Sequence, residues 1–222
     1  MDLFEVLKEV TETPGVAGFE YPVSEVIEKY FREFADEVKK DVLGNVVAIK
    51  RGKNQKFRVM LAAHMDQIGF LVKYISKDGY IGISDAGGFD PTTLIAQRVK
   101  IYTEKGFVRG VIGSVPPHLK RKPQQQPPVP PKLEDLVIDV GADSREEVEK
   151  LGIRVGSVIT FDRTTERLSG DRVTGMAFDD RTGVVSLIKT LEILKDEEIG
   201  FNLYAVSYTH LRATRPLYIS YA

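Results

Sequence analysis

Two short segments of this chain carry residue types that could bind a metal ion. The first is His64-Met65-Asp66, which follows an apolar run from Phe57 to Ala63. Ligands of open α/β sheets sit beyond the carboxyl ends of the strands, where the last side chains project into a crevice. A neutral imidazole suits Zn²⁺ or Co²⁺, and a carboxylate such as Asp66 can orient it through the other ring nitrogen. The segment alone favours a plainer reading, in which His64 simply pairs with its acidic neighbour.

The second segment is Ala177–Gly183, which contains two adjacent aspartates and opens an expected helix. An acidic pair at a helix start usually caps the helix and interacts with its dipole. Capping would need only one aspartate, so the other could face a crevice and bridge two cations. Arg181 could pair with either acid. This segment alone favours capping.

Composition excludes several classes of protein. Hydrophobic residues make up 42 % of the 222 residues, so a sizeable core can form. The formal net charge of -1 argues against a nucleic-acid or membrane-surface protein, because both need a basic excess. No apolar run approaches the ~20 residues that span a bilayer, and the acidic start does not resemble a signal peptide. The lack of cysteine excludes disulfides and thiolate ligands and is compatible with a reducing cytoplasm.

Hydrophobic periodicity indicates the elements that must position these segments. Apolar residues at helical spacing predict helices over residues 3–10 and 22–34, with Pro14-Gly15 ending the first. Strands are expected at 37–42, 45–50 and 57–63, and the last reads as buried on both faces because it is continuously apolar. A further amphipathic helix over 184–194 and a core strand over 201–206 follow the second candidate segment.

Between the two candidate segments the pattern changes to short alternating strands, as in a small β-barrel or sandwich. Strands are expected near 68–74, 80–84, 97–103, 107–112 and 158–161, with a short helix capped by Ser144 and Glu147. A Pro- and Gln-rich stretch over 115–132 predicts a surface loop. The fold class is therefore α/β, with an α/β domain over 1–67 and 163–206 that is interrupted by an all-β insert over 68–162.

Six motifs taken together resemble the tetrahedral, or glutamyl and deblocking, aminopeptidases. These are cytosolic dinuclear metallopeptidases with a β-rich insert, and the resemblance runs from Leu3 to about Val206. The motifs are TPGVAGFE (13–20), DVLGNVVA (41–48), AAHMDQIGF (62–70), GGFD (87–90), QRV (97–99) and AFDDRTG (177–183). Their order around the insert outweighs the plainer readings of the two segments.

The resemblance implies a role for each matching residue. His64 would be a terminal ligand of one of two divalent metals, Zn²⁺ or Co²⁺, and Asp66 would orient it. Asp179 would bridge both metals, whereas Asp180 is the less favoured ligand. The substrate would be a short peptide, and the insert would mediate dimers that assemble into a dodecamer. We expect no nucleic-acid or membrane partner.

The chain departs from this family after Val206. The family continues into two adjacent glutamates, one the general base and one a ligand, and later supplies an aspartate and a histidine. Residues 207–222 contain no acidic residue and resemble a frameshifted or appended sequence. We expect this chain to be truncated and inactive or nearly so. His118 is expected to be solvated in its loop, and no role is assigned to His210.

Three functions are therefore compared. The first is metal-dependent release of N-terminal residues from peptides by water that two metals activate. The second is a self-association module with an incomplete metal site. A glycosidase would use Asp66 and Asp179 as its carboxylate pair but would leave His64 without a purpose, and it ranks third.

Overall fold

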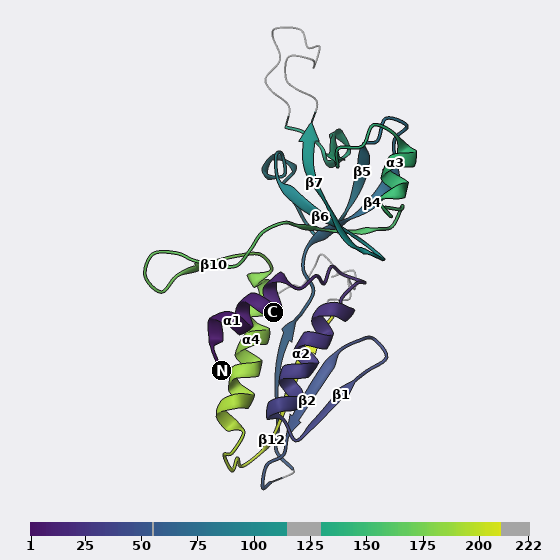
Figure 1. Ribbon diagram of the computed structural model, residues 1–222. Helices are drawn as coiled ribbons and strands as arrows, with labels where there is room; N and C mark the ends of the chain where they lie inside the picture. The colour runs from purple at the N-terminus through teal and green to yellow at the C-terminus, as the bar shows by residue number, and fades with distance from the viewer. Residues whose placement is uncertain (55, 115–129, 210–222) are drawn as a thin grey trace, which may run out of the picture. The chain divides into compact units, whose positions relative to one another are not determined.

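The computed structural model describes residues 1–54, 56–114 and 130–209, which form two compact units (Figure 1). The first unit contains Met1–Asp66 and the chain from Phe178 onward, and the second contains Gln67–Ala177. Each unit has its own hydrophobic core. His118 and His210, and most of the loop predicted over 115–132, lie outside the described residues. Within the described ranges, no helix combines the length and apolarity needed to cross a membrane.

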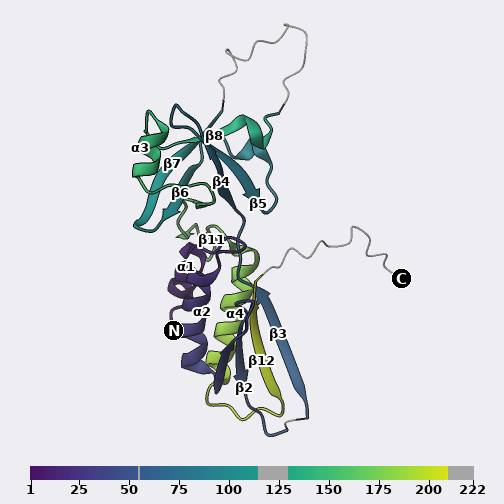
Figure 2. The same ribbon diagram turned by 90° about the vertical axis from the view of Figure 1, so that its right-hand side faces the viewer.

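Three helices of the first unit lie on one face of its sheet (Figure 2). Helix α1 (Leu3–Glu12) begins at Asp2, whose side chain accepts a hydrogen bond from the Phe4 amide at 2.9 Å. Helix α2 (Tyr21–Phe34) has Pro22 in its first turn, where the missing N–H costs nothing. Helix α4 (Phe178–Leu194) begins within the second candidate segment. The predicted amphipathic helices are confirmed.

The sheet of the first unit has the order β1-β2-β12-β3. Its strands are β1 (Glu37–Lys40), β2 (Val46–Lys50), β12 (Asn202–Tyr208) and β3 (Arg58–His64). Strand β12 runs antiparallel to β2 and parallel to β3, and its last residue pairs with His64. The buried side chains of α1, α2 and α4 pack against those of the sheet and form the core of this unit. The helices contribute Val6, Val10, Val23, Ile27, Phe31, Val184, Ile188 and Leu191, and the strands contribute Val46, Ala48, Leu203 and Ala205.

The prediction that the apolar run 57–63 is buried on both faces is wrong. Strand β3 is exposed over most of its length, and Met60 retains 69 % of its accessible surface. The described helices of this unit cover only one face of the sheet (Figure 2), and β3 is also the last strand of the sheet order, with no strand in the described ranges at its outer edge. Continuous apolarity indicates burial only where layers cover both faces of the strand. An apolar open edge of this kind favours association with another strand.

The second unit is built on a closed antiparallel barrel of the order β4-β5-β8-β7-β6-β9, as the strand pattern predicted. The strands are β4 (Gly69–Ile75), β5 (Ile81–Ala86), β6 (Arg98–Thr103), β7 (Gly106–Ser114), β8 (Leu136–Asp139) and β9 (Val158–Phe161). Strand β8 is absent from the sequence prediction, although its pairing with β5 and β7 closes the barrel. Closure removes the sheet edges.

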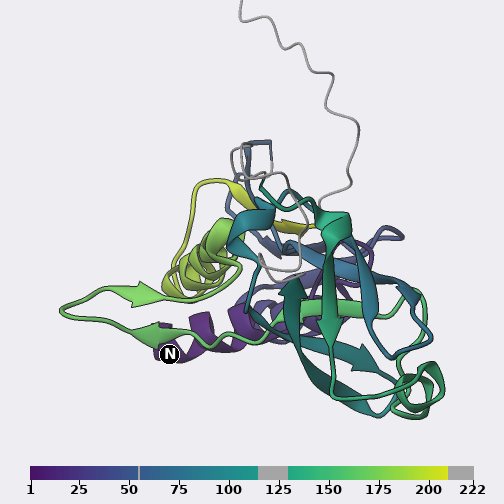
Figure 3. The same ribbon diagram turned by 90° about the horizontal axis from the view of Figure 1, so that it is seen from above.

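The second unit also contains short helices, turns and a two-stranded ribbon outside the barrel. Helix α3 (Arg145–Lys150) is capped by Ser144, whose Oγ accepts from the Glu147 amide at 3.3 Å as the capping pattern predicted. Turns η1 (Pro91–Thr93) and η3 (Leu133–Asp135) connect strands. Strands β10 (Glu166–Arg167) and β11 (Val173–Thr174) form a ribbon that extends from the barrel (Figure 3). The predicted insert 68–162 lies within this unit, which continues to Ala177.

One ion-pair cluster on the barrel should make its stability depend on pH. Asp162 accepts from Nε of Arg109 at 2.8 Å and lies 3.2 Å from Nζ of Lys100. Burial opposes ionisation of Asp162, but the hydrogen bonds and charges of Arg109 and Lys100 outweigh it and lower the pKa of this carboxyl. A lowered pKa means that the folded state binds the proton less tightly. The resulting stabilisation is present above the ordinary pKa of about 3.9 and is lost as pH falls through the folded-state pKa.

Asp162→Asn is therefore expected to lower the free energy of unfolding by about 1–2 kcal/mol at neutral pH. It should also flatten the dependence of stability on pH below about 4. Urea unfolding at pH 7 and at two acidic pH values measures both effects, with exposed Asp171→Asn as the matched control. An unchanged pH profile in Asp162→Asn would show that the cluster contributes nothing.

Candidate metal centre

The first unit brings His64, Asp66 and Asp179 together. His64 is the last residue of β3, and its Nδ1 lies 3.1 Å from Oδ1 of Asp66. The other ring nitrogen, Nε2, lies 3.2 Å from Oδ1 of Asp179, which is 115 residues away in sequence. The imidazole thus has one carboxylate on each side.

The backbone around His64 is held by a neighbouring strand. The Met65 amide donates to the carbonyl of Tyr208 at 2.9 Å, which extends the pairing of β3 with β12 by one residue. Met65 itself is fully buried. The side chains before and after Met65 therefore emerge from a fixed point at the carboxyl end of β3.

Asp179 and Asp180 occupy a non-helical stretch at the start of α4. Ala177 has a φ of 58°, and the two aspartates have backbone angles outside the helical region. Their side chains consequently diverge. Asp179 is turned toward His64, whereas the Asp180 carboxylate lies only 2.5 Å from where a Cβ on Gly183 would stand. The glycine at 183 makes room for Asp180 against the first turn of α4.

Arg181 is the largest fully buried side chain of the described residues, with 0 % exposure. The sequence suggested that it pairs with one of the aspartates. In the structure its Nε donates to the Met65 carbonyl at 2.8 Å, and its Nη1 donates to the carbonyls of Val10 at 2.7 Å and Thr13 at 2.5 Å. The guanidinium therefore satisfies carbonyl groups at the end of α1, where a positive charge is favoured by the helix dipole.

The donor geometry fits one metal ion in part. Two ligands of one tetrahedral Zn²⁺ at ordinary bond lengths stand about 3.3 Å apart. The observed 3.2 Å between Nε2 of His64 and Oδ1 of Asp179 matches this spacing. Asp179 is 97 % exposed, so its second oxygen is open to further partners, whereas His64 is 21 % and Asp66 13 % exposed. No group of three or more potential metal ligands occurs within residues 1–54, 56–114 and 130–209.

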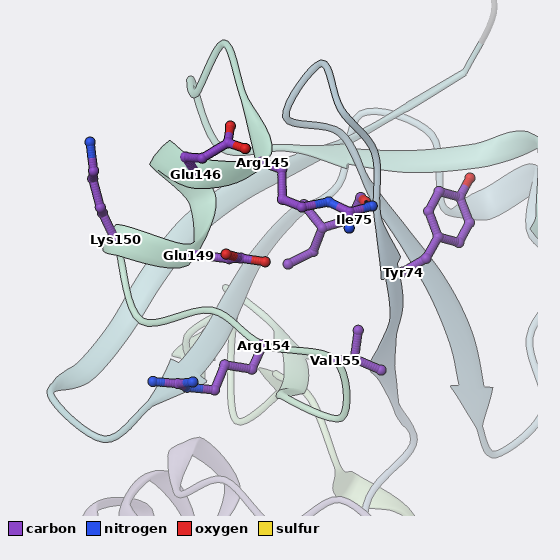
Figure 4. A pocket seen from close by; sticks show the side chains of 8 residues that line it. All are labelled: Tyr74, Ile75, Arg145, Glu146, Glu149, Lys150, Arg154 and Val155. Atoms are coloured by element: carbon purple, nitrogen blue, oxygen red, sulfur yellow. The ribbon is translucent and has the colours of Figure 1, made fainter.

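One open surface hollow lies elsewhere in the chain. It has a volume of about 870 Å³, belongs to the barrel unit, and is lined by side chains of β4, α3 and the turn that follows α3 (Figure 4). Glu146 and Glu149 face it together with Arg145, Lys150 and Arg154, and Arg145 is tied to the carbonyl of Ile75. An open hollow with mixed charge selects no ligand class. Chemistry therefore singles out His64 and Asp179 rather than this hollow.

Two solved structures of aminopeptidases resemble this chain over most of its length. An aminopeptidase from the archaeon Desulfurococcus kamchatkensis is 40 % identical, with a TM-score of 0.85 over 93 % of this chain and 55 % of that one. The TET1 peptidase of Pyrococcus horikoshii is 34 % identical, with a TM-score of 0.81 over 94 % of this chain and 61 % of that one. The chain therefore shares the fold of somewhat more than half of each of these two structures.

The chain belongs to the M42 glutamyl aminopeptidase family, whose model matches residues 44–210. A lysyl aminopeptidase from Pyrococcus furiosus is 40 % identical over 205 residues, which are 91 % of this chain and 58 % of that protein. The resemblance inferred from the motifs is confirmed. The match extends to residue 210, a few residues past the end inferred at about Val206. The chain spans less than two thirds of these relatives.

Proposed function

We propose that this protein is a cytoplasmic, metal-dependent aminopeptidase that removes N-terminal residues from short peptides. The observation that carries the proposal is the placement of the His64 imidazole between Asp66 and Asp179, with donor spacing suited to Zn²⁺ or Co²⁺, in a chain of this family. Divalent cations, when bound, would polarise the scissile carbonyl and activate water for hydrolysis.

Each residue contributes to that site in its own way. His64 offers Nε2 as a ligand, while Asp66 accepts from Nδ1 and holds the ring in the tautomer that leaves Nε2 free to bind. Asp179 offers one oxygen next to Nε2 and a second, exposed oxygen that can bridge to another cation. The Asp180 carboxylate lies against Gly183 in the first turn of α4, and we assign it no ligand role.

His64 and Asp179 supply too few ligands for two cations. We propose that the other ligands and the general base come from residues outside the described ranges, and that these 222 residues expressed alone are inactive. Metal-dependent release of N-terminal residues by that chain would contradict this part of the proposal.

Substrate preference and assembly follow from the relatives only as proposals. The family is described as glutamyl and one relative as lysyl, so acidic and basic N-terminal residues are the first substrates to compare. The TET1 peptidase of Pyrococcus horikoshii can assemble into a tetrahedron or a large octahedral shell. We propose that this protein also forms a homo-oligomer.

Metal removal and restoration test the proposed function. The protein expressed from its complete gene is treated with a chelator, dialysed and reloaded separately with Zn²⁺, Co²⁺ or Mg²⁺, and then assayed on peptides that begin with Glu, Lys or Leu. We expect activity to disappear on chelation and to return with Zn²⁺ or Co²⁺. An oligomeric, metal-free protein without peptidase activity would instead favour a self-association module. Undiminished activity after complete chelation would refute metal dependence.

A further inference from the structure

We propose that Arg181 is a positioning residue that sets the spacing between His64 and Asp179. This inference rests on the proposed function, because it concerns the same site. The hydrogen bonds described below join Arg181 to backbone carbonyls. It acts through the backbone segments that carry the ligands, which the following contacts establish.

The first step is the contact between Arg181 and Met65. Nε of Arg181 donates to the Met65 carbonyl at 2.8 Å, while the Met65 amide donates to Tyr208 at 2.9 Å. The peptide between the two predicted site residues is thus held from both sides. His64 and Asp66 flank Met65, so a shift of this peptide would move both side chains.

The second step is the position of Arg181 in the chain. It lies two residues after Asp179, in the first turn of α4. The same side chain that holds the segment of His64 is therefore covalently close to Asp179. Because the backbone at Asp179 and Asp180 is not helical, helix hydrogen bonding alone does not determine where Asp179 lies. The Arg181 guanidinium supplies a long-range restraint between two segments that are more than a hundred residues apart.

The third step is the pocket that receives the guanidinium. Nη1 donates to the carbonyls of Val10 and Thr13 at the end of α1. Gly15 completes this pocket, since a Cβ there would stand 2.5 Å from Nη2 of Arg181. The Thr13-Pro14-Gly15 segment, which the proposed chemistry leaves without a role, is thereby explained as the receptor for Arg181. A planar fork with donors in several fixed directions is required, and an ammonium group cannot replace it.

Two variants test this assignment in the protein expressed from its complete gene. Arg181→Lys keeps the positive charge but loses the fork. Gly15→Ala places a Cβ 2.5 Å from Nη2 of Arg181 and 2.6 Å from Cγ1 of Val23, so it crowds the unchanged guanidinium and also the Val23 side chain. Exposed Arg32→Lys on α2 is the matched control. Three properties are measured at a temperature where every variant is folded. They are the rate of amide hydrogen exchange at 65–66 and 178–180 in the metal-free protein, the Co²⁺ affinity from the visible absorption of the complex, and kcat and KM as separate values.

We expect both variants to exchange faster at 65–66 and at 178–180 and to bind Co²⁺ roughly 10–100-fold more weakly than the Arg32→Lys control. Their kcat should fall more than their KM rises, because misplaced ligands act mainly on the reaction step. If faster exchange is confined to the end of α1 while Co²⁺ affinity is unchanged, Arg181 only anchors that helix and the assignment is wrong. If the unaltered protein takes up no Co²⁺, the proposed function fails, and the metal-free exchange data still decide whether Arg181 joins the two segments.

Discussion

Asp179→Asn should reduce aminopeptidase activity by more than about 100-fold in the protein expressed from its complete gene. Loss of a group that merely orients a ligand already costs 10–100-fold in metal affinity or activity, so loss of the carboxylate proposed to bridge the metals should cost more. The amide has nearly the same shape as the carboxylate but carries no negative charge and offers only one oxygen. Metal content per subunit and kcat/KM, measured on the same preparation, check the prediction.

Asparagine is the informative replacement because it distinguishes a ligand from a helix cap. Asn and Asp cap helices about equally well, so a purely capping Asp179 would tolerate the change with little effect on activity or on unfolding. Asp196→Asn, an exposed aspartate beyond the other end of α4, serves as the matched control. Full activity and full metal content in Asp179→Asn would leave this residue as a cap, and the proposed site would then be wrong.

The second large effect is expected in the core of the barrel. Phe70→Ala should lower the free energy of unfolding of the barrel unit by about 3–5 kcal/mol, the usual cost of removing a buried phenylalanine ring. Phe70 is fully buried, stacks on Phe89 at 4.3 Å between ring centroids, and meets the edge of Phe161 at 5.7 Å. Its removal would take away both transfer free energy and two aromatic contacts.

Scanning calorimetry is the suitable measurement, because the chain contains no tryptophan to report on unfolding. The control is Phe107→Ala on the same barrel, where the ring is 45 % exposed and lies beside Lys100 and Arg109. It should cost less than about 1 kcal/mol. Equal effects of the two substitutions would mean that the barrel core is not organised around Phe70.

The sequence predicts the positions of the helices and strands better than it predicts which of them are buried or paired. Periodicity identified α1, α2 and most barrel strands, because amphipathic patterns are local properties of the chain. It failed for β3, whose burial depends on neighbours that no local pattern specifies. It also missed β8, a four-residue strand that follows the proline-rich stretch. This strand is too short for a clear pattern of its own and is recognised by its pairing with β5 and β7.

In the candidate site, too, some residues were predictable from the sequence and others were not. His64 and Asp179 were each ambiguous alone, and only the order of several motifs favoured a metal site over a paired histidine and a capped helix. The function of Arg181 was not predictable from those motifs, because its acceptors are backbone carbonyls. Every residue has a carbonyl, so the sequence carries no signal for such a partner. A buried arginine is recognisable only when the chain is folded around it.

The barrel unit leaves the first unit after Asp66 and the chain returns at Phe178. Both crossing points are tied together inside the first unit, by His64 with Asp179 and by Met65 with Arg181. In evolutionary terms, such a junction permits an inserted module to change in length, surface or partner while its host remains under separate selection. We therefore expect divergence within residues 67–177, outside the GGFD and QRV motifs, to accumulate faster than at the borders of the insert.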